Sequence, residues 1–196
     1  MKLTVRIISG QFKSRRLKSA PPAGIRPTSD KLKETIFNII GNSVDGAVFL
    51  DGCAGTGGIG VEALSRGAAM VCFVEQNRKA CRIIRENLAM LKVEEGLRIL
   101  EMDLAKGLDV ATLEGLEFDI AFVDPPYEAT DLYEVSLAKV PLKPDGLLIL
   151  EHSKRKNLPE AAGKLRRVRS LVQGDAALAF YRAPDEGSII PGAFEA

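Results

Sequence analysis

Residues 47–60 read AVFLDGCAGTGGIG, a short apolar run that ends in an aspartate and a glycine-rich turn. A candidate helix, IGVEALSRGA (59–68), overlaps the turn, and a second apolar run, MVCFVE (70–75), follows it. A strand, a glycine-rich turn and a helix in this order are typical of the first unit of a nucleotide-binding α/β sheet. The stretch therefore predicts a sheet that binds its ligand at the carboxyl ends of its strands.

Short apolar runs and helical stretches alternate through the rest of the chain. Because strands buried on both faces are nearly continuous in apolar residues, strands are predicted at AVFLD (47–51), MVCFVE (70–75), LRILEMD (97–103), FDIAFVD (118–124) and GLLILEHS (146–153). Crossover helices are predicted at IGVEALSRGA (59–68), NRKACRIIRENLAML (77–91) and TDLYEVSLAKV (130–140). LRRVRSLV (165–172) and ALAFYR (177–182), joined by QGDA, predict a C-terminal antiparallel hairpin. The expected fold class is α/β, a doubly wound, mostly parallel, seven-stranded sheet.

The N-terminal residues predict a small extension of that sheet. TVRIIS (4–9) and RRLKSA (15–20) predict a short β-hairpin, and DKLKETIFNIIG (30–41) predicts a helix capped by Thr28 or Ser29. We expect three parts: residues 1–41 as a basic hairpin and helix, residues 42–183 as the α/β domain, and residues 184–196 as a loose tail.

Charge is distributed unevenly along a chain whose net charge is only +1. Residues 1–33 hold nine Lys/Arg and one acidic residue, whereas the remainder holds 18 basic and 25 acidic residues. A second basic cluster comprises Lys154, Arg155, Lys156, Lys164, Arg166, Arg167 and Arg169. A basic arm on an acidic body indicates a polyanionic partner, and the second cluster favours nucleic acid over a merely solvated surface.

Several classes of protein are disfavoured by composition. No apolar run is long enough to cross a membrane, and no signal peptide is recognisable, so we expect a cytoplasmic protein. Cys53, Cys72 and Cys81 show no CxxC spacing and are expected to be reduced packing residues. His152 is the only histidine, which excludes a multi-histidine metal site, and we expect it to be structural.

The glycine-rich turn leaves two cofactors to distinguish. Gly55, Gly57 and Gly60 satisfy G-x-G-x-x-G, which fits NAD, although such glycines also serve tight turns and packing. However, Asp51 would oppose a pyrophosphate at the following helix, and no Lys or Arg lies between residues 47 and 65. S-adenosylmethionine carries an ammonium and a sulfonium and has no phosphate, so a nearby carboxylate suits it. Glu75 and Asp103 end the next two strands and can accept hydrogen bonds from its ribose and adenine.

The fourth strand ends in Asp124, Pro125, Pro126 and Tyr127. The exocyclic amine of a nucleobase is a poor nucleophile, because its lone pair is delocalised into the ring. Two acceptors on its two N–H bonds, the Asp124 carboxylate and the Pro125 carbonyl, would favour the reactive pyramidal form. Tyr127 offers a face on which an extruded base can stack. Cytosine-C5 methylation would instead need a thiolate, and no cysteine lies near this loop.

With DGCAGTGGIGVEALSRGA, VEQNRKA, EMD and VDPPY in place, the chain resembles the class I methyltransferases that act on exocyclic base amines. RIISGQFKSRRL and RPTSDKLKETIFNII narrow the resemblance to the bacterial small-subunit rRNA guanine-N2 methyltransferase D family. It implies S-adenosyl-L-methionine as methyl donor and a guanine of 16S rRNA, in a partly assembled 30S subunit, as acceptor. We expect the protein to act as a monomer.

The resemblance also assigns residues to roles. It implies cofactor contacts at Asp51, Gly52, Ala54, Gly55, Gly57, Glu75, Asp103 and Leu104, and a target-amine site at Asp124, Pro125, Pro126 and Tyr127. RNA contacts are expected at Arg6, Lys13, Arg15, Arg16, Arg26, Thr28 and Lys31. Gly52 and Cys53 stand where the family more often has Leu and an aromatic residue, and RSLVQGDAALAFYR lacks the family's Lys-x-Tyr-Gly.

Three other functions stay open from the sequence alone. A DNA adenine-N6 or protein-amide methyltransferase would use the same Asp-Pro-Pro-Tyr chemistry on another planar amine. An NAD-dependent dehydrogenase is supported by the glycines and Glu75 only. A non-catalytic RNA-binding module would keep the fold without the chemistry.

Overall fold

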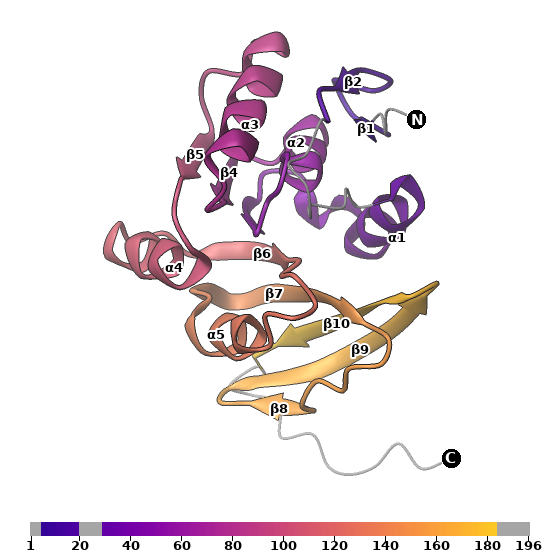
Figure 1. The fold of residues 1–196 in the computed structure, drawn as a ribbon, viewed down its shortest axis with the longest axis vertical. Coiled ribbons are helices and arrows are strands. Elements are labelled where there is room, and N and C mark those ends of the chain that lie inside the picture. Colours follow the sequence, from indigo (N-terminus) through magenta and orange to yellow (C-terminus); the bar gives the residue numbers. More distant parts are fainter. Residues whose placement is uncertain (1–4, 20–28, 184–196) are drawn as a thin grey trace.

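The computed structural model describes residues 5–19 and 29–183, which form one large mixed sheet flanked by helices, with a small N-terminal hairpin (Figure 1). The strand order in the large sheet is β5-β4-β3-β6-β7-β10-β9-β8. The parallel part comprises β3 (Val48–Gly52), β4 (Met70–Val74), β5 (Leu97–Leu100), β6 (Phe118–Val123) and β7 (Leu142–Ser153). The antiparallel part comprises β8 (Ala161–Ala162), β9 (Leu165–Gln173) and β10 (Ala176–Arg182). The predicted α/β class and the C-terminal hairpin are therefore confirmed.

The helices are α1 (Asp30–Ile40), α2 (Gly58–Ser65), α3 (Arg78–Met90), α4 (Leu104–Leu113) and α5 (Asp131–Lys139), and a 3₁₀ turn, η1 (Gly41–Val44), follows α1. Ser29 caps α1, because its hydroxyl accepts the Leu32 N–H. The hairpin strands are β1 (Val5–Arg6) and β2 (Arg16–Leu17). No helix in residues 5–19 and 29–183 is long and apolar enough to span a membrane.

Two elements differ from the sequence-based prediction. The helix α4 was not predicted, because Gly107 interrupts its apolar face and LAKGLDVATL has no clear polar side. The large sheet has eight strands in the described residues where seven were predicted. The additional strand, β8, has only two alanines, which pair with Leu165 and Arg166 across a tight turn at Gly163. Two residues are too few to produce an alternating pattern in a sequence.

Apolar side chains pack on both faces of the sheet, in two separate clusters. On one face Phe49, Phe73 and Phe122 pack with side chains of α1, α2 and α3. On the other face Leu50, Val74 and Val123 pack with side chains of α4 and α5. Successive strand residues thus point to opposite faces, as the pleat requires. This double burial explains why the strands were recognisable as apolar runs.

The N-terminal extension belongs to the first of these clusters. Val5, Ile7 and Leu17 of the hairpin segment are buried in it together with Ile36 and Phe37 of α1. The predicted boundary near residue 41 therefore divides segments that share one apolar core. The proposed tail, residues 184–196, lies outside the described residues.

Candidate active site

A cavity of about 1020 Å³ opens at the carboxyl edge of the parallel strands. Its walls come from the turn after β3, the ends of β4, β6 and β7, the start of α4, the β9–β10 turn and the N-terminal turn of α1. Ligands of open α/β sheets bind at this edge, where neighbouring loops diverge. The volume is at the upper end of the roughly 300–1,000 Å³ typical of small-molecule sites, so it can admit more than one group.

Glycines shape the turn between β3 and α2. Gly57 caps α2 in the left-handed conformation at φ 78°, and its N–H donates to the Ala54 carbonyl at 2.8 Å. A Cβ on Gly60 would lie 2.3 Å from the Phe73 ring, so this position needs glycine for close packing of α2 on β4. Of the cofactor residues predicted in this turn, Ala54 and Gly55 line the cavity, whereas Gly57 does not. Gly52 instead packs beneath it, near Val123 and Leu104.

Asp51 is the penultimate residue of β3 and is only 2% exposed, yet it lines the cavity. Its Oδ2 accepts the Gly60 N–H at 2.7 Å, in the first turn of α2. Burial raises the pKa of Asp51 to about 8, the hydrogen bond from Gly60 opposes the rise, and the Glu75 carboxylate adds to it. A buried carboxylate of this kind gains most from a ligand that brings a positive charge.

Glu75 and Asp103 both reach the cavity, as predicted, but each also holds the backbone. Glu75 Oε2 accepts the Gly55 N–H at 2.7 Å and Oε1 accepts the Asn77 N–H at 2.7 Å. Glu75 therefore fixes the glycine turn to the end of β4. Asp103 caps α4 by accepting the Lys106 N–H at 3.0 Å, and this bond lowers the pKa of Asp103. Each carboxylate oxygen has a second lone pair with which it can still accept from a ligand.

The Asp-Pro-Pro-Tyr segment follows β6 and lines the same cavity as the glycine turn. The Asp124 N–H donates to the Gly52 carbonyl at 3.2 Å, which joins this segment to the end of β3. The Ala129 N–H donates to the Pro126 carbonyl at 2.9 Å and closes a turn beyond it. Asp124 is half-buried, Pro125 is buried, and Tyr127 is 39% exposed at the rim. All four predicted residues line the one cavity.

The charge of the cavity wall separates the two cofactor hypotheses. Its described lining includes seven carboxylates and only two lysines, which are Lys31 and Lys33. Lys33 is committed to a buried ion pair with Glu62. A pyrophosphate would be repelled by such a wall, whereas a cationic ligand would be attracted. The site therefore fits S-adenosylmethionine better than a dinucleotide.

The thiols and the histidine do not provide a nucleophile. The expectation that no cysteine lies near the Asp-Pro-Pro-Tyr segment is wrong, because Cys53 lines the same cavity. Burial raises the pKa of its thiol, and Glu75, Asp124 and Asp51 raise it further. Burial also raises the pKa of Cys72 and Cys81. His152 is buried with Nδ1 2.9 Å from the Ser153 carbonyl, and burial lowers its pKa. In residues 5–19 and 29–183 no group of His, Cys, Asp or Glu is arranged to hold a metal ion.

The predicted RNA-contacting residues mostly lie outside the cavity. Arg6, Lys13, Arg15 and Arg16 are exposed on the N-terminal arm, and Arg6 pairs with Asp30 at 2.9 Å. Lys31 is also exposed, but it lines the mouth of the cavity. Arg26 and Thr28 lie outside the described residues. The basic arm and the cavity are thus linked through the start of α1.

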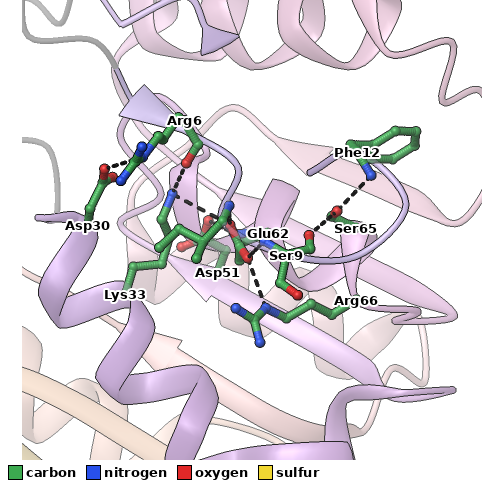
Figure 2. A network of polar contacts seen from close by, with 11 residues as sticks. Arg6, Ser9, Phe12, Asp30, Lys33, Asp51, Glu62, Ser65 and Arg66 are labelled. Atoms are coloured by element: carbon green, nitrogen blue, oxygen red, sulfur yellow. Dashed lines mark hydrogen bonds and ion pairs between the residues drawn. The ribbon is translucent and has the colours of Figure 1, made fainter. Parts of the chain in front are cut away.

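A buried polar network holds this arm in place (Figure 2). Glu62, on α2, accepts the N–H groups of Ile8 and Ser9 at 2.8 and 3.0 Å. Its carboxylate also lies 3.6 Å from Lys33 Nζ and 2.8 Å from Arg66 Nε. Lys33 in turn donates to the Arg6 carbonyl at 2.6 Å. The arm is therefore tied at once to α1 and α2.

Several wall residues were not identified from the sequence. Glu151, near the end of β7, lines the cavity, and so does the β9–β10 turn from Gln173 to Ala176. The run of carboxylates at successive strand ends could have revealed Glu151, which follows GLLIL as Asp124 follows IAFV. Gln173 had no such signal, because an antiparallel partner strand brings it to this edge.

Comparisons with known proteins agree with this geometry. The family model described as "Conserved hypothetical protein 95" matches residues 5–182. The chain is 37% identical to YlbH of Bacillus subtilis, a candidate rRNA methyltransferase by name, over 91% of this chain and 98% of that protein. It is 32% identical to ribosomal RNA small subunit methyltransferase D of Escherichia coli, over 93% of this chain and 92% of the relative. The solved structure of the Escherichia coli protein yhhF superposes with a TM-score of 0.79 at 31% identity, over 93% of this chain and 99% of yhhF. The chain belongs to the ribosomal RNA small subunit methyltransferase D family.

Proposed function

We propose that this protein transfers a methyl group from S-adenosyl-L-methionine to the exocyclic N2 amine of a guanine in 16S rRNA. The observation that carries the proposal is that Asp124–Tyr127 and the glycine turn line the same cavity, with the Asp124 N–H bonded to the Gly52 carbonyl. The names of the relatives indicate ribosomal RNA of the small subunit as the acceptor. The choice of guanine N2 and of a partly assembled 30S subunit is an inference from family resemblance.

The described residues provide a matching set of contacts for the cofactor. When bound, S-adenosyl-L-methionine supplies an electrophilic methyl group on a sulfonium. The buried Asp51 carboxylate provides negative charge at the base of the turn, where the cofactor's ammonium can bind. Glu75 provides acceptors for ribose hydroxyls, and Asp103 with Leu104 borders the place for adenine. These roles are consistent with an acidic wall that would disfavour a phosphate-bearing ligand.

The acceptor amine is held by the end of β6. The Asp124 carboxylate and the Pro125 carbonyl each accept a hydrogen bond from one N–H of the amine, and Tyr127 stacks on the extruded base. The nitrogen lone pair is then directed at the methyl group, whose bond to sulfur breaks as the bond to nitrogen forms. The alkylated nitrogen is acidic and releases its proton to the Asp124 carboxylate to which it is hydrogen-bonded. Asp124 is half-buried, so its carboxylate is positioned without being fully exposed to competing water. The main requirement of such a transfer is that the amine nitrogen and the methyl carbon are aligned at roughly 3–3.5 Å.

The basic arm is suited to binding a large, folded RNA substrate. Exposed Arg15, Arg16 and Lys13 lie on a segment fixed to the catalytic body through Glu62. Phosphate contacts by such residues orient an RNA without reading its sequence. A monomer provides both the arm and the cavity, so one chain can bind the RNA and perform the reaction.

Methyl transfer to defined acceptors tests the proposal. Purified protein and labelled S-adenosyl-L-methionine are incubated with small-subunit particles or naked 16S rRNA from a strain lacking the gene, and with duplex DNA. Digestion and mass spectrometry then identify the modified base. We expect N2-methylguanine at one position, formed faster on particles than on naked rRNA. N6-methyladenine in DNA, or no labelled guanine in any RNA, would contradict the proposal.

A further inference from the structure

Glu151 occupies a position in the cavity that matches that of Asp124. The strands β6 and β7 are parallel neighbours with Val123 opposite Leu150. The next residues in this register are Asp124, directly after β6, and Glu151, two residues before the end of β7. Glu151 is 7% exposed and lines the same cavity as Asp124 and Tyr127. A second carboxylate therefore lies on the strand next to the target-amine site.

The adjoining corner of the cavity has unused hydrogen-bonding capacity. Gln173 ends β9 and pairs with Ala176 of β10, which in turn pairs with Ser153 of β7. In the part of the chain that the structure describes, the buried Oε1 of Gln173 has no hydrogen-bond partner. Buried polar atoms in proteins are nearly always satisfied by protein, water or ligand. This corner is therefore suited to a polar ligand edge.

The chemistry of the bases determines what a carboxylate beside the amine site can select. In guanine the N2 amine has the N1–H donor as its neighbour on the Watson–Crick edge. The amine of adenine lies between the N1 and N7 acceptors, and the amine of cytosine lies beside the N3 acceptor. An acceptor-only group placed next to the amine clamp would bind guanine and repel the other two.

We propose that Glu151 accepts a hydrogen bond from N1–H of the target guanine and thereby selects guanine over adenine and cytosine. This inference rests on the proposed function, since it needs a guanine whose N2 amine lies at Asp124. It adds what the Asp-Pro-Pro-Tyr segment lacks, because two acceptors can hold any exocyclic amine. Glu151 is thus a specificity-determining residue, and Asp124 with Pro125 performs the positioning common to all three bases.

The test changes the target base so that it loses the N1–H donor but keeps the exocyclic amine. 2-Aminopurine keeps the exocyclic amine of guanine but has an acceptor at N1 and no oxygen at position 6. RNA carrying guanine or 2-aminopurine at the methylated position is built by ligation and assembled into particles. The quantity measured is the ratio of single-turnover rates for the two bases. For the unaltered protein we expect guanine to be preferred by about 100-fold or more, because rejection leaves a buried polar group unpaired.

The Glu151→Gln variant keeps the size of the side chain and adds an N–H donor that suits the N1 acceptor of 2-aminopurine. We expect its preference for guanine to fall by at least about tenfold, mainly through slower reaction of guanine. The matched control is Glu128→Gln, which removes a carboxylate from the exposed rim of the same cavity and should leave the ratio unchanged. Melting temperature and cofactor affinity of both variants establish that they are folded.

An unchanged ratio in folded Glu151→Gln would overturn the inference while leaving the proposed function intact. If instead the unaltered protein forms no N2-methylguanine, the proposed function fails and the inference fails with it. Should Glu151→Gln not fold, Glu151→Asp withdraws the carboxylate by one methylene. We expect Glu151→Asp to lower the preference for guanine by less than Glu151→Gln would. An unchanged ratio in Glu151→Asp would also contradict the role of Glu151.

Discussion

Lys33 Nζ lies 3.6 Å from Glu62 Oε2, and the two side chains are 1% and 0% exposed. This pair joins α1 to α2 beneath the N-terminal arm, and the arm's own N–H groups complete the shell around Glu62 (Figure 2). Burial lowers the pKa of Lys33, and the Glu62 charge opposes that shift. The Glu62 charge that fixes the arm therefore also opposes the effect of burial on the pKa of Lys33.

The variant Glu62→Gln tests this relationship. Removing one partner leaves Lys33 buried without its counter-charge, so we expect a loss of about 3–5 kcal/mol in the free energy of unfolding. The loss should shrink as pH rises, because a Lys33 that releases its proton no longer needs the pairing. Urea unfolding at several pH values measures both effects. The control is Asp109→Asn, which breaks the exposed pair with Lys139 and should cost less than about 1 kcal/mol. Equal losses in the two variants would disprove the anchoring role.

Gly10 provides a separate test of how the arm docks. Its φ is +83°, and a Cβ there would lie 1.7 Å from the Ser65 carbonyl oxygen of α2. The adjacent Gln11 N–H donates to that same oxygen at 2.7 Å. We expect Gly10→Ala to detach the arm, which unfolding and limited proteolysis within residues 5–18 would reveal. The control, Gly115→Ala, has a similar φ of +71° but open space around it, so it should cost only about 1 kcal/mol. An arm that stays protected in Gly10→Ala would contradict the docking.

Asp51 predicts a pH dependence of cofactor binding. With a pKa of about 8, its carboxyl is mostly protonated near pH 7 when no cation is bound, and a cationic ligand must displace that proton. Affinity for S-adenosyl-L-methionine should therefore rise on the order of tenfold between about pH 6.5 and about pH 8.5. In Asp51→Asn this rise should be absent, while titration of the ligand itself affects both proteins alike. Calorimetry at each pH measures the difference, and parallel curves would exclude an electrostatic role for Asp51.

The same shift has a consequence for stability. Burial raises the native pKa of Asp51 well above the ordinary value of an aspartate, so the folded protein holds this proton over a pH range in which the unfolded chain has lost it. Stability from this group is complete below about pH 4 and declines as pH rises toward about 8. The stability of Asp51→Asn relative to that of the unaltered protein should therefore be higher at about pH 8.5 than near pH 5. Thermal unfolding of the cofactor-free proteins measures this, and a constant difference would contradict the raised pKa.

The arm residues predict the salt dependence of RNA binding. Arg15 and Arg16 are exposed on the arm. Replacing Arg16 by Ala should reduce the slope of log K against log salt by about 0.7–0.9 if it neutralises one phosphate. The control is Lys139→Ala, which removes an exposed positive charge between α5 and α4 and should leave the slope unchanged. Filter binding of small-subunit particles across salt concentrations gives the slope for each variant. A slope for Arg16→Ala equal to that of the unaltered protein would mean that Arg16 does not contact an RNA phosphate.

Local patterns in the sequence were sufficient for most of the fold and for several residues that line the cavity. Strands buried on both faces read as apolar runs, and carboxylates at their ends marked Asp51, Glu75, Asp103 and Asp124. The helix α4 and the strand β8 were missed because neither has a periodic pattern long enough to recognise. Their places in the structure depend on packing against distant segments.

Long-range partners were beyond the reach of local patterns. In the sequence, Glu62 looks like an ordinary polar residue of a predicted helix. In the structure it is completely buried against a hairpin some fifty residues earlier in the chain. Glu75 was predicted to contact a ligand, but its two bonds to backbone N–H groups depend on how the β3 turn meets β4. Such roles follow from topology, which brings sequence-distant groups together after the strands have paired.

The central claim is that the Asp124 carboxylate activates the acceptor amine, and the most direct measurement is single-turnover methyl transfer by Asp124→Ala. Small-subunit particles serve as acceptor, and calorimetry measures cofactor affinity in parallel. We predict that transfer falls by about 100-fold or more, because a preorganised partner of the reacting group is removed, while cofactor affinity changes little. A transfer rate equal to that of the unaltered protein would contradict the account.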